Sequence, residues 1–233
     1  MKIEVWSDFA CPFCYIGKKR FEQALANFPH KEDVQVVFKA YQLNPAAPKT
    51  MSGTAAEAFA KSHNSTVEQA KARFRMFSEN AKTVGLVYDY DKVQMTNTFD
   101  SHRLAKWAGT LGKEDILTDR LMKAYFTEGS NLAEENVLFR LAGELGLDQA
   151  QAKQILAEGT YGDVVKAEIA EARKIGVQGV PFFVVNRKYG ISGAQEEAYF
   201  AAALEQIWGE DHPIQSLDGD EKGHVCDDES CTI

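Results

Sequence analysis

The sequence lacks long apolar runs and an excess of positive charge, and it contains little cysteine. No stretch approaches the roughly 20 apolar residues of a membrane-spanning helix, and no charged and apolar leader precedes the first strand pattern. The 233 residues include 34 acidic and 26 basic side chains, for a formal net charge of −8. Nucleic acids and anionic membranes both require a basic surface. We therefore expect a globular cytoplasmic protein without a nucleic-acid or membrane partner.

The four cysteines form two close pairs, Cys11/Cys14 and Cys226/Cys231. Neither pair joins distant parts of the chain. Because stable disulfides are uncommon in a reducing compartment, close pairs there are typical of catalytic, redox-sensing or metal-binding sites. These three classes of site are the ones to distinguish.

The first pair lies where a strand pattern gives way to a helix pattern. Residues 2–6 alternate polar and apolar side chains as a short strand does, and residues 13–28 are typical of a helix. Cys11 is therefore expected at the helix N-terminus, where unpaired N–H groups and the helix dipole favour a thiolate. Cys14, one turn later, could attack a mixed disulfide on Cys11 and release the bound partner.

A Cys-x-x-Cys pair is also half of a structural zinc site. Zinc requires four ligands, typically including a second close pair, whereas thiol exchange requires βαβ surroundings. Residues 34–43 form a second strand pattern, which completes a βαβ unit with parallel strands. This context favours exchange and places the cysteines at the carboxyl end of the sheet.

Two further features of this helix bear on the thiols. Pro12 suits a first helical turn, and the uncharged Phe13 leads us to expect a reduction potential of intermediate value. Charges one to two turns away are screened when they are exposed. We expect the basic residues that follow, Lys18, Lys19 and Arg20, to lie on a solvated face.

The rest of the chain divides into a helical block and a second strand-rich part. Helix patterns recur between residues 54 and 176, with one ambiguous run at 86–90. They cover residues 66–84, 99–111, 113–126, 134–145, 149–157 and 163–175. A hairpin pattern over residues 182–192 and a helix pattern over 196–208 then follow. We predict an α/β protein in the order β-α-β, helical block, β-β-α.

This order, with thiols after the first strand and Pro181 before the third, resembles the thioredoxin fold with a large inserted all-helical subdomain. The expected division assigns residues 1–45 and 177–209 to the thioredoxin-like domain. Residues 46–176 form the insertion, and residues 210–233 form an acidic tail that carries the second cysteine pair.

Several motifs spread over nearly the whole chain carry a closer resemblance. They are Ser7-Asp8 before Cys11-Pro12-Phe13-Cys14, Asn97-Thr98 with His102-Arg103, Gly179-Val180-Pro181-Phe182-Phe183, Gly193-Ala194-Gln195, and the tail pair Cys226/Cys231. Together they resemble the DsbA family of oxidoreductases, in its FrnE-like branch. The resemblance implies a thiol–disulfide oxidoreductase, oxidant or isomerase, in which Cys11 attacks and Cys14 resolves. Its implied partners are protein thiols and disulfides, with glutathione as a further candidate, and its only redox group is the disulfide itself. A monomer and a homodimer are both compatible with the sequence.

The resemblance also implies roles for residues around the thiols. Pro181 is expected to be cis and to face them, so that the Val180 backbone pairs with an extended substrate beside Cys11. The alternative is that Pro181 merely begins an edge strand. Predicted substrate-pocket residues are Pro12, Phe13, Asn97 and His102. For Asn97 a helix cap, and for His102 a surface pair, are alternative roles.

The tail pair and the overall activity each leave alternatives open. Cys226 and Cys231 are predicted as an auxiliary redox pair, with a local disulfide or a zinc site including His224 as alternatives. The whole chain could instead be a non-redox metal-binding module. A glutathione-dependent isomerase or transferase, of the kappa or 2-hydroxychromene-2-carboxylate isomerase type, is a third possibility. Those enzymes generally carry serine where this chain has Cys11, so the presence of both Cys11 and Cys14 favours dithiol exchange.

Overall fold

The computed structural model describes residues 1–213. Its strands are β1 (Lys2–Ser7), β2 (Gln35–Ala40), β3 (Phe182–Val185) and β4 (Tyr189–Ser192). Its helices are α1 (Pro12–Asn27), the short 3-10 helix η1 (Lys31–Asp33), α2 (Ala55–Ser62), α3 (Val67–Lys82), α4 (Phe99–Thr110), α5 (Glu114–Phe126), α6 (Glu135–Glu144), α7 (Gln149–Glu158), α8 (Gly162–Lys174) and α9 (Glu197–Asp211). Within residues 1–213, no helix combines the length and apolarity that crossing a membrane requires.

The four strands form one sheet in the order β2-β1-β3-β4. β1 and β2 are parallel, with Ile3 opposite Val36, and β3 runs antiparallel to β1, with Val5 opposite Phe183. β3 and β4 form the predicted hairpin. The α/β architecture and the order β-α-β, helical block, β-β-α are therefore confirmed.

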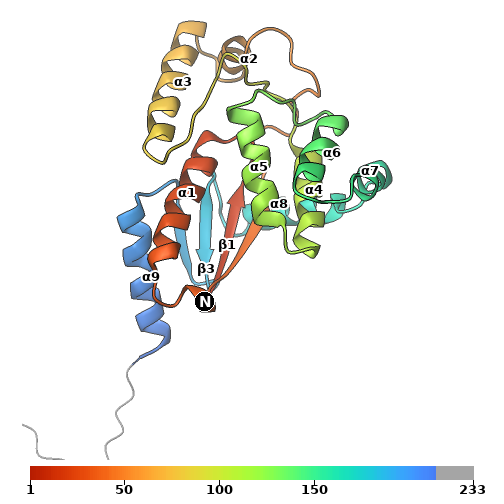
Figure 1. Ribbon diagram of the computed structural model, residues 1–233. Coiled ribbons are helices and arrows are strands. Elements are labelled where there is room, and N and C mark those ends of the chain that lie inside the picture. The colour runs from red at the N-terminus through yellow and green to blue at the C-terminus, as the bar shows by residue number, and fades with distance from the viewer. Residues whose placement is uncertain (214–233) are drawn as a thin grey trace, which may run out of the picture.

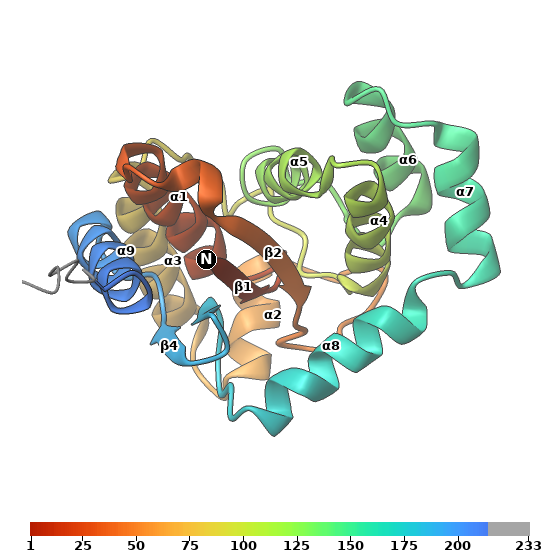
Figure 2. The same ribbon diagram turned by 90° about the horizontal axis from the view of Figure 1, so that it is seen from below.

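Helices cover both faces of the sheet (Figures 1 and 2). Ile3 and Val5 point to one face, where they pack with Phe21 of α1 and Phe200 of α9. Trp6 points to the other face, where its indole N–H donates to the Glu168 carbonyl of α8 at 3.0 Å. The alternation of side chains along β1 thus positions α1, whose N-terminus carries the thiols.

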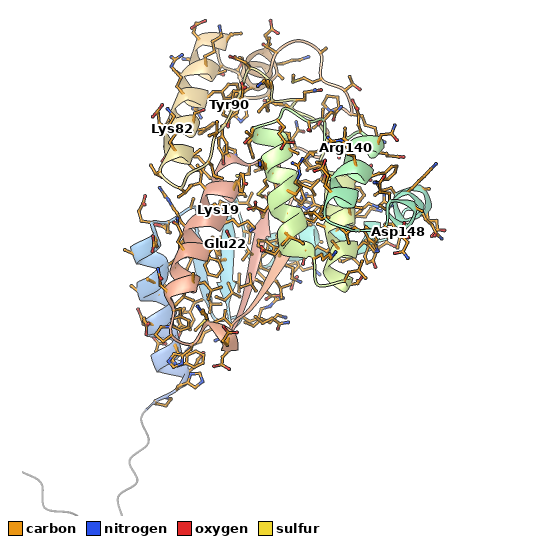
Figure 3. The ribbon with its side chains drawn as sticks, in the orientation of Figure 1. Lys19, Glu22, Lys82, Tyr90, Arg140 and Asp148 are labelled. Carbon is orange, nitrogen blue, oxygen red and sulfur yellow. The ribbon has the colours of Figure 1, made fainter. Side chains whose placement is uncertain are left out.

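A second apolar core lies in the helical block and extends to the thiols. Leu121 and Phe126 of α5 are fully buried there, in the same cluster as Cys11 and Cys14. The ring of Phe126 stacks on Tyr88 at 4.4 Å between centroids. The ambiguous run at residues 86–90 is not a strand but an irregular segment. Its aromatic rings pack against neighbouring helices. Tyr90, which Figure 3 labels, stacks on Phe74 of α3 with 4.0 Å between ring centroids.

One helix was not resolved by the sequence patterns. α2 begins after Thr54, whose side chain accepts from the Glu57 N–H while Glu57 accepts from Thr54, a complete capping box. The Thr-x-x-Glu spacing was the available signal. Elsewhere the ends of the helices differ from the expected ones by one to three residues, as at α9, which continues to Asp211.

The basic residues of α1 are not on a solvated face as predicted. Lys18 is 3% exposed because α5 packs beside α1, and its Nζ lies 2.8 Å from an Asp115 carboxylate oxygen and also pairs with Glu22. Lys19 pairs with Glu22 at 3.1 Å and also with Asp119 (Figure 3 labels Lys19 and Glu22). These pairs join the helix that carries the thiols to the helical block.

Candidate active site

Cys11 is the N-cap of α1, and Cys14 lies one turn inside the helix. The Cys11 N–H donates to the Asp8 carbonyl at 3.1 Å, and the Cys14 N–H to the Cys11 carbonyl at 3.1 Å. Both thiols are free and buried: the exposed fraction is 4% for Cys11 and 2% for Cys14. Helix α1 begins with Pro12, which has no N–H to leave unpaired in the first turn.

The segment before β3 faces Cys11. The Val180–Pro181 peptide bond is cis, and the Cys11 thiol donates to the Val180 carbonyl at 3.4 Å. β3 begins immediately afterwards and lies between β1 and β4, so Pro181 does not open an edge strand. The Pro181 carbonyl in turn accepts from the Gly193 N–H at 2.9 Å, which joins this segment to the turn after β4.

Gly17 allows α1 to approach this proline segment closely. A Cβ built on Gly17 would lie 3.0 Å from Pro181 Cγ and 3.2 Å from Ala194 Cα. Arg20, one turn later, donates to the Ala194 carbonyl at 2.8 Å. Because Gly17 has no side chain, α1 can lie this close to Pro181. The sequence pattern of α1 did not indicate this contact.

Replacing Gly17 by valine should destabilise the fold by about 1–3 kcal/mol, because the added atoms overpack against Pro181 and Ala194. Gly209 on α9 is the matched control, since a Cβ there meets nothing within 4 Å. Urea unfolding of Gly17→Val and Gly209→Val measures the difference. Equal stability of the two variants would contradict the close contact.

Asp8 connects the thiol loop to two distant segments, the start of α4 and the chain after β2. Its carboxylate accepts from the Thr98 hydroxyl at 2.8 Å, the Leu43 N–H at 2.8 Å and the Ala10 N–H at 3.4 Å. His102 Nε2 lies 3.5 Å from the same carboxylate, and the Asp8 side chain is 2% exposed. Because its acceptor sites are occupied by donors from distant segments, Asp8 fixes the loop before Cys11 in place.

The structure does not place Asn97 or His102 among the residues that line the cavity described below. The Asn97 amide donates to the Pro45 carbonyl at 3.0 Å and accepts from the Phe99 N–H at 2.9 Å, so it joins the loop after β2 to the first residue of α4, whose N-cap is Thr98. His102 is buried and its ring lies 4.7 Å from that of Phe9. Helical periodicity does not show which distant segments these two side chains contact.

A cavity of about 600 Å³ opens in front of Cys11. Val180 and the dipeptide between the thiols, Pro12 and Phe13, contribute to its wall. Its other lining residues are Asp8, Ala10, Leu43, Asn44, Ala47, Phe59, Ser62, His63, Arg73, Phe77, Met95, Thr96, Thr98 and Tyr125. The volume falls in the range of small-molecule and short-peptide sites. Most of these residues come from the helical block, whose contribution the thiol motif alone did not reveal.

Burial dominates the electrostatics of Cys14. It raises the pKa of the Cys14 thiol well above the usual value, and the neighbouring Cys11 raises the pKa further. The Ser7 hydroxyl and the Asp8 N–H oppose this shift, and the latter lies 3.5 Å from Cys14 Sγ. Cys14 is therefore a thiol at neutral pH, and its attack requires the loss of a proton.

The second cysteine pair, Cys226/Cys231, lies outside the described residues, so its predicted redox, disulfide and zinc roles all stay predictions. Among residues 1–213, no group of three or more His, Cys, Asp and Glu side chains is arranged to hold a metal ion. A metal site that includes the tail cysteines would also lie outside the described residues.

Comparison with known proteins places this architecture in a family. The family model of the DSBA-like thioredoxin domain matches residues 2–205. A probable DsbA oxidoreductase from Streptomyces coelicolor is 36% identical, with a TM-score of 0.86 over 100% of this chain and 99% of its own. The uncharacterized protein YwbO of Bacillus subtilis is 27% identical over 207 residues, 87% of this chain and 94% of its own.

A third similarity concerns the fold alone. A 2-hydroxychromene-2-carboxylate isomerase is 14% identical and has a TM-score of 0.69 over 93% of this chain and 100% of its own. The Streptomyces coelicolor structure is more similar to this chain in both sequence and fold, and the family model matches residues 2–205. The narrower FrnE-like assignment stays a prediction, and the chain belongs to the family of DSBA-like thioredoxin domains.

Proposed function

We propose that this protein is a thiol–disulfide oxidoreductase that acts on peptide disulfides through Cys11 and Cys14. The observation that carries the proposal is the Cys11 thiol at the N-terminus of α1, 3.4 Å from the Val180 carbonyl and at the wall of the cavity. An attacking thiol, a buried second thiol and an adjacent substrate cavity are the parts that exchange requires.

The proposed reaction has two displacement steps. The Cys11 thiolate attacks one sulfur of the substrate disulfide, which forms a mixed disulfide and expels the other substrate sulfur as a thiolate. Cys14 then loses its proton and attacks Cys11 Sγ, so the first substrate sulfur leaves and a Cys11–Cys14 disulfide remains. The substrate gains two electrons and the protein loses two. The reverse sequence donates the disulfide to reduced cysteines, and an external thiol such as glutathione would restore the dithiol.

Val180 supplies the proposed backbone contact for substrate. Its carbonyl faces Cys11, and a mixed disulfide on Cys11 would displace the thiol proton that this carbonyl now accepts. The Val180 backbone is then available to an extended peptide, whose main-chain groups pair without regard to sequence. This mode suits an enzyme that acts on cysteines in varied proteins.

The first experiment is to measure the reduction potential of Cys11/Cys14 in glutathione buffers. We expect an intermediate value, between about −270 mV for thioredoxin and about −120 mV for DsbA. A Cys226→Ser/Cys231→Ser variant measured alongside shows whether the tail pair shifts that potential. Failure to form a Cys11–Cys14 disulfide in any buffer would overturn the proposed function.

The resolving step should depend steeply on pH. Burial raises the pKa of Cys14, and the burial contribution persists when Cys11 is bonded to substrate. Below that pKa the thiolate fraction grows about tenfold per pH unit, so decay of the mixed disulfide should accelerate equally. Stopped-flow decay of a Cys11 adduct with a fluorescent thiol measures this between pH 6 and 9. A flat profile would contradict Cys14 as a buried thiol that resolves the adduct.

A further inference from the structure

The cavity in front of Cys11 is apolar on most of its wall and carries an uneven charge. Besides Cys11 and the buried Tyr125, its ionisable lining residues are Asp8, His63 and Arg73. Asp8 is buried and already accepts three hydrogen bonds. The His63 ring stacks on Phe59 with 3.9 Å between ring centroids, and its Nδ1 lies 3.0 Å from the Phe59 carbonyl. An imidazole side chain adds no negative charge to the cavity. Arg73 is therefore the charged residue of the cavity wall that has no partner of opposite charge within residues 1–213.

Arg73 lies on α3, and its side chain is exposed. Within residues 1–213, no carboxylate oxygen lies within 4.0 Å of it or of Arg75, whereas Lys71 and Lys82 on the same helix are paired. A guanidinium presents a rigid fork of donors that matches a carboxylate in two hydrogen bonds. Its position at the wall of the cavity that holds Cys11 makes that match available to a substrate.

A second cavity extends the first along α2. It measures about 460 Å³ and shares Asn44, Ser62 and Met95 with the cavity at Cys11. Its one carboxylate, Glu57, is occupied by the Thr54 N–H at 2.8 Å and the Thr54 hydroxyl at 3.0 Å. The two cavities together can accept an extended segment several residues long, and the second also carries Lys61, so Glu57 adds no net negative charge to its wall.

We propose that Arg73 selects substrates, so that the preferred disulfides lie in peptide segments carrying Asp or Glu near the reacting cysteine. The inference rests on the proposed exchange function and specifies its substrate class. Apolar side chains of the segment would contact Phe13, Phe59 and Phe77, while its carboxylate pairs with the Arg73 guanidinium. Arg73 is thereby a specificity residue that does not touch the reacting sulfurs.

The test uses peptide mixed disulfides that release a coloured thiol when Cys11 attacks. Each peptide carries one cysteine among apolar residues and either Glu or Gln at one of the three positions on each side. The Glu-to-Gln ratio of second-order rate constants is measured for wild type, Arg73→Gln and Arg75→Gln. Arg75 is the matched control because it is also exposed on α3 but does not line the cavity.

For wild type we expect a ratio of about twofold to fivefold at one or more positions, which is the upper range for an exposed ion pair. Arg73→Gln should reduce the ratio to about one, whereas Arg75→Gln should retain it. Using ratios removes any general effect of a substitution on folding or on the thiols.

Two results would overturn the inference and leave the proposed function intact. One is an absence of Glu preference at every position in wild type that still exchanges thiols. The other is an equal loss of preference in Arg73→Gln and Arg75→Gln, which would show a diffuse charge effect. A wild type that exchanges with no peptide, while Cys11→Ser behaves identically, would overturn the proposed function and this inference with it.

Discussion

Replacing Cys11 by serine should reduce the rate of peptide disulfide reduction by on the order of 1,000-fold or more, because a neutral hydroxyl cannot replace the thiolate as nucleophile. The nearly isosteric change should leave the fold intact, since a serine hydroxyl can still donate to the Val180 carbonyl. The measurement is steady-state reduction of a disulfide-linked fluorescent peptide. Far-ultraviolet circular dichroism confirms that the variant is folded.

Cys14→Ser provides the complementary result. Cys11 would still attack, but the mixed disulfide would persist because the resolving thiol is absent. Mass spectrometry should then show one substrate peptide bonded to each protein molecule, whereas Cys11→Ser should show none. Substrate adducts on Cys14 in the Cys11→Ser variant would reverse the two roles, and rapid turnover by either variant would contradict the two-step mechanism.

The sequence predicted the strands and the helix around the thiol motif because their residue patterns and their order along the chain indicate the same βαβ unit. A strand before Cys11, a helix after it and a second strand pattern at residues 34–43 require a parallel βαβ unit, which the pairing of β1 with β2 confirms. The position of Val180 beside Cys11 is a long-range contact that residue patterns alone do not encode. Only the resemblance to known oxidoreductases suggested it.

The sequence could not orient side chains that depend on packing between helices. His102 and Asn97 were expected in the pocket, and the structure instead places one beside Asp8 and the other on loop carbonyls. Lys18 was expected in solvent, but α5 covers it and supplies Asp115. In each case a distant segment determines the environment, and helical periodicity does not specify which segment that is.

Asp8 shows the same limit and leads to a second large effect. In the sequence, Asp8 stands out only as part of the Ser7-Asp8 motif, yet it accepts hydrogen bonds from Ala10, Leu43 and Thr98 in a buried position. Asp8→Ala would leave those donors without an acceptor. We expect a loss of about 3–5 kcal/mol in the free energy of unfolding, as for other broken buried charge networks.

Asp8→Asn removes the negative charge of the side chain but retains its shape. The amide retains one oxygen acceptor but turns an NH₂ donor toward other donors, so we expect a smaller loss, about 1–3 kcal/mol. Asp91, an exposed loop residue, is the control, and Asp91→Ala should change stability by less than about 0.5 kcal/mol. Urea unfolding with an unchanged slope measures all three.

The order of these losses tests how the site is held together. If Asp8→Ala costs no more than Asp91→Ala, the thiol loop is positioned by α1 and the sheet alone. If the expected order holds, the loop depends on a carboxylate that joins it to α4 through Thr98 and to the chain after β2 through Leu43. The helical block then has a structural part in thiol chemistry, because α4 belongs to it and Thr98 also lines the cavity. Cys14 would respond as well, since the Asp8 N–H that contacts its sulfur lies in the same loop.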